Sequence, residues 1–320
     1  DLQQTIAMTL RCALKFAVLT AFAASLAEAA DISPGGTGTF GTVIYASGNH
    51  ALSSNGSVAT MQTSGNVFGT VASDGNDGNT DGAFANGSVF HTGGATAGAE
   101  FWRVNLAGNE YAIGSVTIFN RTDCCQSRLA VFDLEVINTA TGTTDVLPQS
   151  VNPPAMNNNN VNGIGASASF PLPNNSIATD LQVTQQAAFS LHAAEVQVFG
   201  DSSLELSGDA LNLEIGSGGS DFVDVEGAAT LDGDLNVDFL TGTNPNAHDV
   251  FDLLTAATID ASLLNTTVTG IGGDYVLQTV DGGNGQILQL VLTPEPASIA
   301  LWGMIAGIFG CGFYFRRRRS

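Results

Sequence analysis

The chain has 320 residues, with 30 acidic side chains against 9 lysines and arginines and a net charge of −21 at pH 7. Between Asp31 and Thr293 the only lysines or arginines are Arg103, Arg121 and Arg128, so this part would repel nucleic acid phosphates and anionic lipid. Its length suits two domains. Short β-branched and aromatic runs between Gly, Asn and Asp turns predict an all-β fold.

The N-terminal residues have the order of a secretory signal peptide. A short basic stretch from Met8 to Lys15 precedes the apolar run from Phe16 to Leu26, and Ala27-Glu28-Ala29 resembles a cleavage signal. A buried helix is the alternative interpretation. We therefore expect residues 1–30 to be a leader and signal peptide for export. Residues 31–42, rich in Gly and Thr, are expected to be a linker.

Residues 74–82 form a turn that is dense in oxygen-bearing side chains and glycine. Hard cations such as Ca²⁺ take several oxygen ligands from flexible turns of this kind. The spacing from Asp77 matches the start of an EF-hand loop. However, the twelfth position is Ser88 and not a bidentate Glu, and no helices are expected on either side. The residues by themselves leave a calcium loop and a plain acidic turn equally open.

Residues 120–128 lie between two predicted strands, 116–119 and 129–132, in the kind of loop that often carries a site. The loop contains two of the three arginines of the exported part and both of its cysteines: Arg121, Cys124, Cys125 and Arg128. In an oxidising compartment the adjacent cysteines can form only a strained local disulfide. The alternative role of the arginines is to neutralise nearby carboxylates such as Asp123.

Six segments of the chain carry a family resemblance. They are Asp77-Gly78-Asn79-x-Asp81-Gly82, Gly87-Ser88-x-x-His91-Thr92, Phe101 to Leu106, Ser115 to Arg121, Cys124-Cys125-x-x-Arg128-Leu129 and Glu195 to Gly200. In this order they resemble the fucolectins of the eel agglutinin and tachylectin-4 type, a branch of the F5/8C discoidin-like, galactose-binding-like domains. The resemblance covers about residues 45–200. It implies a jelly-roll β-sandwich over 43–201.

The resemblance implies carbohydrate binding. In such lectins one histidine and two arginines bind the sugar, and these map to His91, Arg121 and Arg128. The disulfide Cys124–Cys125 would be a small apolar platform against the sugar ring. Guanidinium donors that cannot lose their protons suit a neutral sugar. The expected partner is a fucose-type glycan or exopolysaccharide. The alternative is a structural matrix protein whose lectin-like domain no longer binds sugar.

The resemblance also implies a structural Ca²⁺ ion. Its ligands would come from Asp77, Asn79, Ser88 and Glu195, the backbone oxygen of Ala194 and, in addition, Asp74. Family members commonly have a disulfide between the positions of Val89 and Ala194. The loss of that disulfide would affect the rigidity of the domain and not its sugar chemistry.

From residue 202 to 292 short runs with a two-residue period alternate with Gly, Asp and Asn turns. We expect a β-rich stalk domain that is either a short β-solenoid or a small β-sandwich. Its carboxylates favour a solvated acidic face over a weak cation site. Neither region contains a nucleophile–base pattern, a zinc spacing or a phosphate loop, so the sequence does not predict an enzyme.

Residues 293–320 resemble the PEP-CTERM sorting signal of Gram-negative bacteria. Pro294-Glu295-Pro296 precedes the uncharged run 297–315, which is long enough to cross a bilayer, and four arginines follow at 316–319. The resemblance implies sorting by an exosortase-type membrane protease and a location at the cell surface or in the extracellular matrix. An ordinary C-terminal anchor is the alternative. Either interpretation predicts a transmembrane helix at 297–315.

Overall fold

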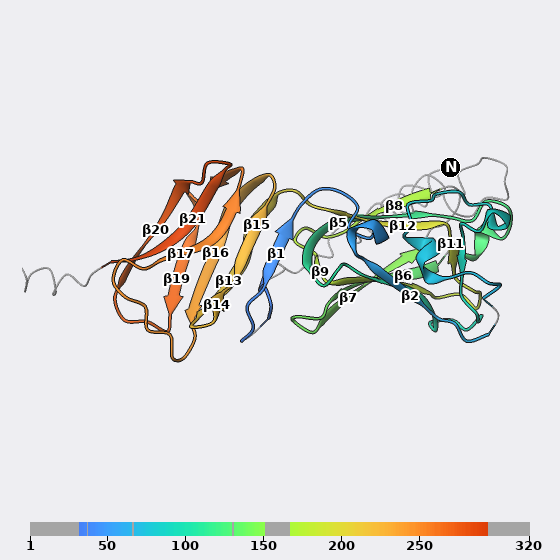
Figure 1. Ribbon diagram of the computed structural model, residues 1–320, viewed down its shortest axis with the longest axis horizontal. Helices are drawn as coiled ribbons and strands as arrows, with labels where there is room; N and C mark the ends of the chain where they lie inside the picture. The colour runs from blue at the N-terminus through green and yellow to red at the C-terminus, as the bar shows by residue number, and fades with distance from the viewer. Residues whose placement is uncertain (1–31, 37, 66, 130, 151–166, 294–320) are drawn as a thin grey trace, which may run out of the picture. The chain divides into compact units, whose positions relative to one another are not determined.

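The computed structural model describes residues 32–36, 38–65, 67–129, 131–150 and 167–293 (Figure 1). Over these ranges the chain consists of β-strands, turns and short 3-10 helices, which confirms the predicted all-β class. The 3-10 helices are η1 (Ser53–Asn55), η2 (Ala72–Gly75), η3 (Phe84–Asn86) and η4 (Gln126–Arg128). Among the described residues, no helix is both long and apolar enough to span a bilayer. The expected signal peptide at 1–30 and the expected span at 297–315 lie outside them.

One antiparallel sheet has the strand order β2-β4-β10-β6-β7. Its strands are β2 (Val58–Met61), β4 (Glu100–Asn105), β6 (Val131–Asn138), β7 (Thr143–Ser150) and β10 (Asp180–Gln185). Every second residue of β4 is buried, because successive residues of a strand point to opposite faces of the sheet. In the middle strand Val183 lies opposite Trp102 of β4 and Leu134 of β6. The buried sides of these strands supply one side of an apolar core.

The strand β5 (Glu110–Phe119) organises a second layer. Three strands pair with it in antiparallel fashion: β8 (Ser167–Pro171), β9 (Ile177–Ala178) and β12 (Glu195–Gly200). Val116 of β5 lies between Val198 of β12 and Phe170 of β8. A short pair, β3 (Phe90–His91) with β11 (His192–Ala193), lies outside these two sheets.

A continuous cluster of buried side chains joins the two layers. At its centre Trp102 is fully buried and stacks on Phe90 with ring centroids 5.7 Å apart. The indole Nε1 of Trp102 donates a hydrogen bond to the carbonyl of Ala72 at 2.8 Å, which satisfies its polar atom inside the core. Two layers of mainly antiparallel strands around one core form a β-sandwich, the architecture that the fucolectin resemblance implies.

From Leu204 onward most strands pair in parallel. One sheet contains β13 (Leu204–Gly216), β16 (Ala228–Phe239), β18 (Thr258–Asp260) and β19 (Asn265–Thr269), with the short β14 (Gly219–Ser220) at the end of β13. A second sheet, which is continuous with the sheet of β5 in the sandwich, contains β15 (Phe222–Val225) and β17 (Val250–Ala256). From β15 to β18 the chain alternates between the two sheets, and β16 lies parallel to β13, β17 to β15, and β18 and β19 to β16. Of the two expected alternatives, this pairing is that of a β-solenoid.

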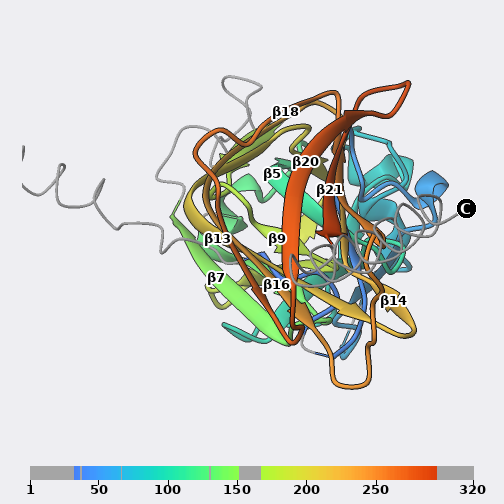
Figure 2. The same cartoon turned by 90° about the vertical axis from the view of Figure 1, so that its left-hand side faces the viewer.

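The solenoid core is built from similar side chains stacked on one another. Leu211 lies beside Leu235, and Leu213 lies beside Val237, all four being buried. The antiparallel strands β20 (Asp274–Asp281) and β21 (Gln286–Thr293) complete the second sheet. Figure 2 views the solenoid from the side on which these two strands lie. In-register stacking of this kind buries an apolar stripe with a simple repeated sequence.

The short strand β1 (Thr42–Tyr45) belongs to both regions. It pairs in parallel with β5 of the sandwich and with β15 of the solenoid, and it lies between them in Figure 1. Upstream of it, Ile32 is fully buried in the solenoid core and forms a bridge with Leu211. The range 31–42, for which the sequence predicts a linker, therefore includes a residue packed in a core.

Candidate functional site

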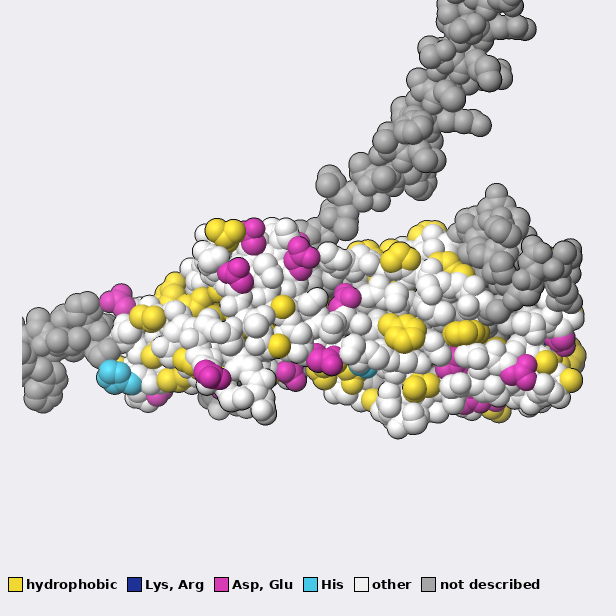
Figure 3. Space-filling model, turned by 90° about the horizontal axis from the view of Figure 1, so that it is seen from above, with side chains coloured by type: hydrophobic (Ala, Val, Ile, Leu, Met, Phe, Trp, Pro, Cys, Tyr) yellow, Lys and Arg dark blue, Asp and Glu magenta, His cyan; other side chains and the backbone are white. Residues whose placement is uncertain are grey.

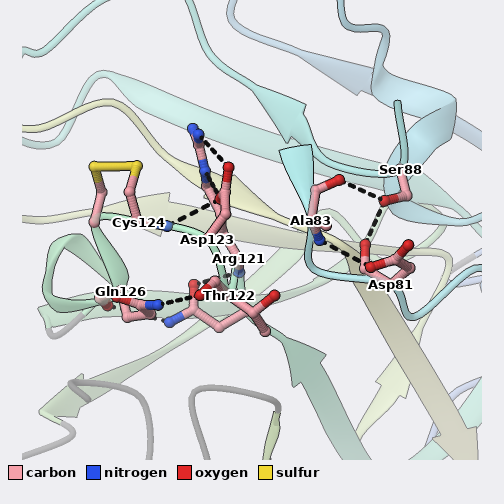
Figure 4. Close-up of polar contacts among 10 residues, drawn as sticks. Asp81, Ala83, Ser88, Arg121, Thr122, Asp123, Cys124 and Gln126 are labelled. Carbon is pink, nitrogen blue, oxygen red and sulfur yellow. Dashed lines mark hydrogen bonds and ion pairs between the residues drawn. A yellow bond between two sulfur atoms is a disulfide. The ribbon is translucent and has the colours of Figure 1, made fainter. Parts of the chain in front are cut away.

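The loop after β5 is held in shape by buried amide side chains (Figure 4). The Nδ2 group of Asn120 donates to the carbonyl of Gln126 at 3.1 Å, and Nε2 of Gln126 donates to the carbonyl of Thr122 at 2.6 Å. Asn120 and Gln126 are both almost fully buried. Cys125 has φ 63°, a left-handed backbone that turns the chain into η4. The residues on this loop therefore project from a fixed frame.

The two adjacent cysteines form a disulfide on the loop. Their Cα atoms lie 3.8 Å apart, and both residues are half-buried. The backbone N–H of Cys124 donates to Oδ1 of Asp123 at 3.0 Å. The disulfide thus presents two sulfur atoms beside the Arg121–Asp123 pair, as Figure 4 shows.

Arg121 is oriented by a neighbouring carboxylate. Its Nε donates to Oδ1 of Asp123 at 2.5 Å, and its Nη2 donates to Oδ2 at 3.0 Å. The hydrogen bonds from Arg121 hold the pKa of Asp123 below its usual range. The guanidinium carbon also lies 4.3 Å from the centre of the Phe84 ring. Because a guanidinium has about five N–H donors, this carboxylate leaves about three of them for a ligand.

Arg128 differs from Arg121 in its partners. Within the described part of the chain, the ion pairs are Arg103 with Asp180 and Arg121 with Asp123, so Arg128 has no carboxylate partner there. Its guanidinium carbon lies 6.0 Å from the centre of the Phe189 ring. The alternative interpretation of the arginines, neutralisation of local carboxylates, therefore describes part of the bonding of Arg121 but not that of Arg128.

His91 lies close to both arginines. Its Nδ1 is 2.8 Å from the carbonyl of Thr92, a contact that requires a proton on Nδ1 and leaves a lone pair on Nε2 of the neutral ring. Burial lowers the pKa of His91, and the positive charges of Arg121 and Arg128 lower it further. The imidazole is therefore neutral at pH 7. The structure thus brings together the three residues that the sequence predicts for sugar binding.

Three further residues of the site are absent from the sequence prediction. The rings of Phe68 and Phe84 lie edge-on to the His91 ring, with centroids 4.9 Å and 6.3 Å away. His192 stacks on His91 with ring centroids 5.9 Å apart and an interplanar angle of 13°. Burial, as the main cause, lowers the pKa of His192 to about 3. His192 faces His91 across the β3–β11 pair, and no local sequence signal indicates that pairing.

The expected calcium ligands lie around the start of β12. Glu195 is fully buried, and each of its carboxylate oxygens accepts the N–H of Gly78 at 3.2 Å. Burial, with a smaller effect of Asp77, raises the pKa of Glu195 to about 7. A nearby cation favours the charged form of a carboxylate that burial has made difficult to ionise. The position of Glu195 therefore fits an oxygen-coordinated cation.

The remaining candidate ligands have bonds within the loop. Oδ1 of Asp77 accepts the N–H of Asn79 at 2.7 Å, and Ser88, which is buried, donates its hydroxyl to the carbonyl of Asp81. Asp74 instead accepts the N–H of Val71 at 3.0 Å and caps η2.

Over the described ranges no three His, Cys, Asp or Glu side chains lie close enough together to hold a metal. Hydroxyl and backbone oxygens, such as that of the buried Ala194, would have to complete the set. Such oxygen donors suit Ca²⁺.

Comparison with known proteins gives matches to the sandwich part of the chain. The family model of the NedA-like, galactose-binding domain of F5/8 type C matches residues 74–170. Fucolectin of Anguilla anguilla is 32% identical over 127 residues, which are 40% of this chain and 75% of that protein. Fucolectin-2 of Anguilla japonica is also 32% identical over 127 residues, and the chain spans 65% of its length.

Among solved structures, a Streptococcus pneumoniae fucose binding module is 28% identical to this chain. It aligns with 48% of this chain and 96% of its own chain, at a TM-score of 0.39.

Proposed function

The chain belongs to the fucolectin family of F5/8 type C, galactose-binding-like domains, and we propose that residues 43–201 bind a fucose-type glycan. One observation carries the proposal. Arg103 is used within the fold by its 3.0 Å ion pair with Asp180, whereas Arg121 and Arg128 both lie near His91. In a region with no other lysine or arginine, both remaining guanidinium groups are therefore found at one place.

His91, Arg121 and Arg128 together form a surface patch, and its hydrogen-bonding groups suit a neutral sugar. Arg121 and Arg128 offer N–H donors, while the neutral His91 offers the lone pair of Nε2 as an acceptor. A sugar hydroxyl both donates and accepts, so it can bridge an arginine and the histidine. The disulfide and the ring of Phe84 supply apolar surface for the C–H face of the sugar.

Asp123 has a supporting role in this proposal. It fixes the plane of the Arg121 guanidinium through two hydrogen bonds, so that the remaining N–H groups point in a set direction. A preorganised donor loses less entropy on binding a ligand than a mobile one. The ion pair with Asp123 therefore orients Arg121. Arg128 has no carboxylate partner in the described chain, so its charge is available to the ligand.

We also propose a structural Ca²⁺ ion between the 77–88 loop and Glu195. Helix η3, which carries Phe84, lies within this loop, so a cation there would fix one wall of the sugar site as well as the sandwich. The buried carboxylate of Glu195 and the buried hydroxyl of Ser88 support the proposal. The ion would supply charge and coordination for loop oxygens and take no part in chemistry on the sugar.

The location of the protein is a further proposal. The signal peptide and the sorting signal expected from the sequence would place the lectin outside the cell, at the surface or in the matrix, with residues 202–292 as a stalk. An exosortase-type protease would act at the tail. Expression of the full chain in a host with and without such a protease, followed by mass measurement of the exported product, tests this part.

Affinity chromatography on immobilised fucose in Ca²⁺ tests the binding function. We expect the native protein to be retained and both Arg121→Ala and Arg128→Ala to flow through with unchanged circular dichroism. Arg103→Gln is the matched control, because it removes an arginine away from the patch. Normal retention of both patch variants contradicts the proposal. Absence of binding by the native protein to any fucoside would leave a structural matrix protein as the function.

A further inference from the structure

The buried rows of the solenoid continue into a segment that precedes the sandwich in the chain. Each row takes one buried side chain from this segment and one from each of two later strands. The rows are Ile32, Leu211 and Leu235 in one sheet, and Val43, Val223 and Leu254 in the other. All six side chains belong to the apolar cluster of the solenoid. Residues 32–45 therefore extend both sheets in register.

The order of the strands is also that of a solenoid coil. Each later coil adds a strand first to the sheet of β13 and then to the sheet of β15, as β16 and β17 do. Residues 32–45 follow the same order, because Ile32 forms a parallel bridge to β13 and the subsequent β1 pairs in parallel with β15. The N–H of Ile32 donates to the carbonyl of Ala210 at 2.9 Å, and its carbonyl accepts the N–H of Asn212 at 2.8 Å. Both backbone groups of Ile32 are thus used in pairing with β13.

Three glycines between Ile32 and β1 bind carboxylates through their backbone N–H groups. The bonds run from Gly35 to Oε2 of Glu110 at 2.6 Å, from Gly38 to Oε2 of Glu214 at 2.6 Å, and from Gly41 to Oδ1 of Asp221 at 2.9 Å. The segment folds back closely on itself, since a Cβ atom at Gly41 would clash with the backbone nitrogen of Gly35. The segment is therefore a fixed part of the fold and not a loose linker.

The chain leaves the solenoid for the sandwich and returns from it at one place. Tyr45 is the last residue of β1, and its carbonyl accepts the N–H of Glu226 at 2.8 Å. Ser202 lies just before β13, and its carbonyl accepts the N–H of Gly227 at 2.6 Å. Two consecutive residues between β15 and β16 thus hold both crossings, so the two ends of the sandwich lie side by side. A domain whose ends meet in this way is suited to insertion into another domain.

We propose that residues 32–45 are the first coil of the solenoid, which caps it, and that the sandwich is inserted between this capping coil and the next coil. The capping coil covers the backbone edges of β13 and β15, which would otherwise be open to pairing with another chain. The stalk is then built from two separate parts of the chain, 32–45 and 204–293. The described core of the sandwich runs from Ala51 to Val198 and includes neither part. Opening of the capping coil therefore loosens the solenoid and leaves the sandwich folded.

Hydrogen–deuterium exchange of the full chain, measured by mass spectrometry, tests this proposal. Ile32→Ala leaves a cavity where the capping coil packs on β13, and Gly41→Ala forces a methyl group against Gly35. We expect either variant to raise exchange in β13 and β15 roughly tenfold, because the capping coil opens more often. Exchange in the sandwich strands β4, β6 and β10 should stay unchanged. The measurement needs no sugar, so a failure of the proposed lectin function does not affect it.

Each variant has a matched control. At Gly272, among the described residues, no atom outside its chain neighbours lies within 4 Å of the Cβ position, so Gly272→Ala should change nothing. Ile118→Ala removes the same side chain as Ile32→Ala but from the sandwich core, and it should raise exchange in the sandwich and not in β13 or β15.

Unchanged exchange of β13 and β15 in both Ile32→Ala and Gly41→Ala overturns the proposal. An equal rise in β4, β6 and β10 also overturns it, because residues 32–45 would then belong to the fold of the sandwich.

Discussion

The sandwich and the solenoid use their residues in different ways. In the sandwich, strands far apart in the sequence pair in antiparallel fashion around Trp102, and the irregular loops between them carry both arginines of the patch. In the solenoid, similar residues such as Leu211 and Leu235 stack in register, and no lysine or arginine occurs from residue 204 to 293. The sandwich thus has loop positions that occur only once and at which a site can form, whereas the solenoid repeats one packing unit.

The surfaces of the two regions follow from this difference. On the solenoid the outward side chains include rows such as Glu214, Asp238 and Thr269 on neighbouring strands. The face in Figure 3 shows Asp and Glu side chains on the described residues and no Lys or Arg in view. Such a surface stays solvated and repels other acidic surfaces.

The largest expected effects come from truncating one large core side chain in each region and comparing the two variants. Trp102→Ala removes the centre of the sandwich core and should cost about 3–5 kcal/mol of unfolding free energy together with all retention on fucose. Leu213→Ala should cost about 2–5 kcal/mol in the solenoid, because it leaves a cavity between stacked strands. Denaturant unfolding and fucose retention of the two variants check this. If Leu213→Ala removed retention as fully as Trp102→Ala, the two cores would depend on each other.

Removal of Ca²⁺ should lower the stability of the sandwich and leave that of the solenoid unchanged. A single ion at about 100 times its Kd stabilises the folded state by roughly 2.7 kcal/mol, so EDTA should lower the thermal midpoint of the sandwich by several degrees. Glu195→Gln should have the same effect and abolish the response to EDTA. Calorimetry with and without Ca²⁺ measures both, with Asp232→Asn in the solenoid as the control carboxylate. An unchanged midpoint in EDTA contradicts a structural ion.

Acid should weaken sugar binding through His91. Its pKa is lowered, chiefly by burial, so the neutral acceptor persists from pH 7 to below the ordinary value of about 6.5, and affinity falls only when the ring takes up a proton. Besides Arg121 and Arg128, which oppose protonation, Glu100 favours it weakly. His91 takes up a proton more readily in the unfolded chain than in the folded one. Its contribution to the free energy of unfolding is therefore present above about pH 6.5 and is lost as the pH falls. Fucoside affinity measured from pH 8 to 4 checks the profile, which His91→Gln should flatten.

The smallest expected effect concerns the orientation of Arg121. Asp123→Asn keeps the shape of the side chain but removes the charge that holds the guanidinium. Since Asp123 is 37% exposed, the pair is screened by water, and we expect a loss of only a few-fold in fucoside affinity, about 0.2–1 kcal/mol. Titration of Asp123→Asn against Asp145→Asn on β7 measures it. A loss as large as that of Arg121→Ala would indicate that Asp123 contacts the sugar itself.

Local patterns in the sequence were sufficient for the all-β class and for the composition of the site loop. In β4 every second residue is buried, including Trp102, because successive strand residues point to opposite sides. The proximity of Arg121, Cys124, Cys125 and Arg128 required only that they share one short loop.

The tertiary structure alone decided which distant residues meet at that loop. His192 stacks on His91 across the β3–β11 pair, and Phe84 and Phe189 approach the arginines from separate segments. It also decided that Ile32 is packed in the solenoid core and that most strands from Leu204 onward pair in parallel. A two-residue period states which face of a strand is buried, but not against which strand. That choice depends on the sum of many weak packing and register terms over the whole chain.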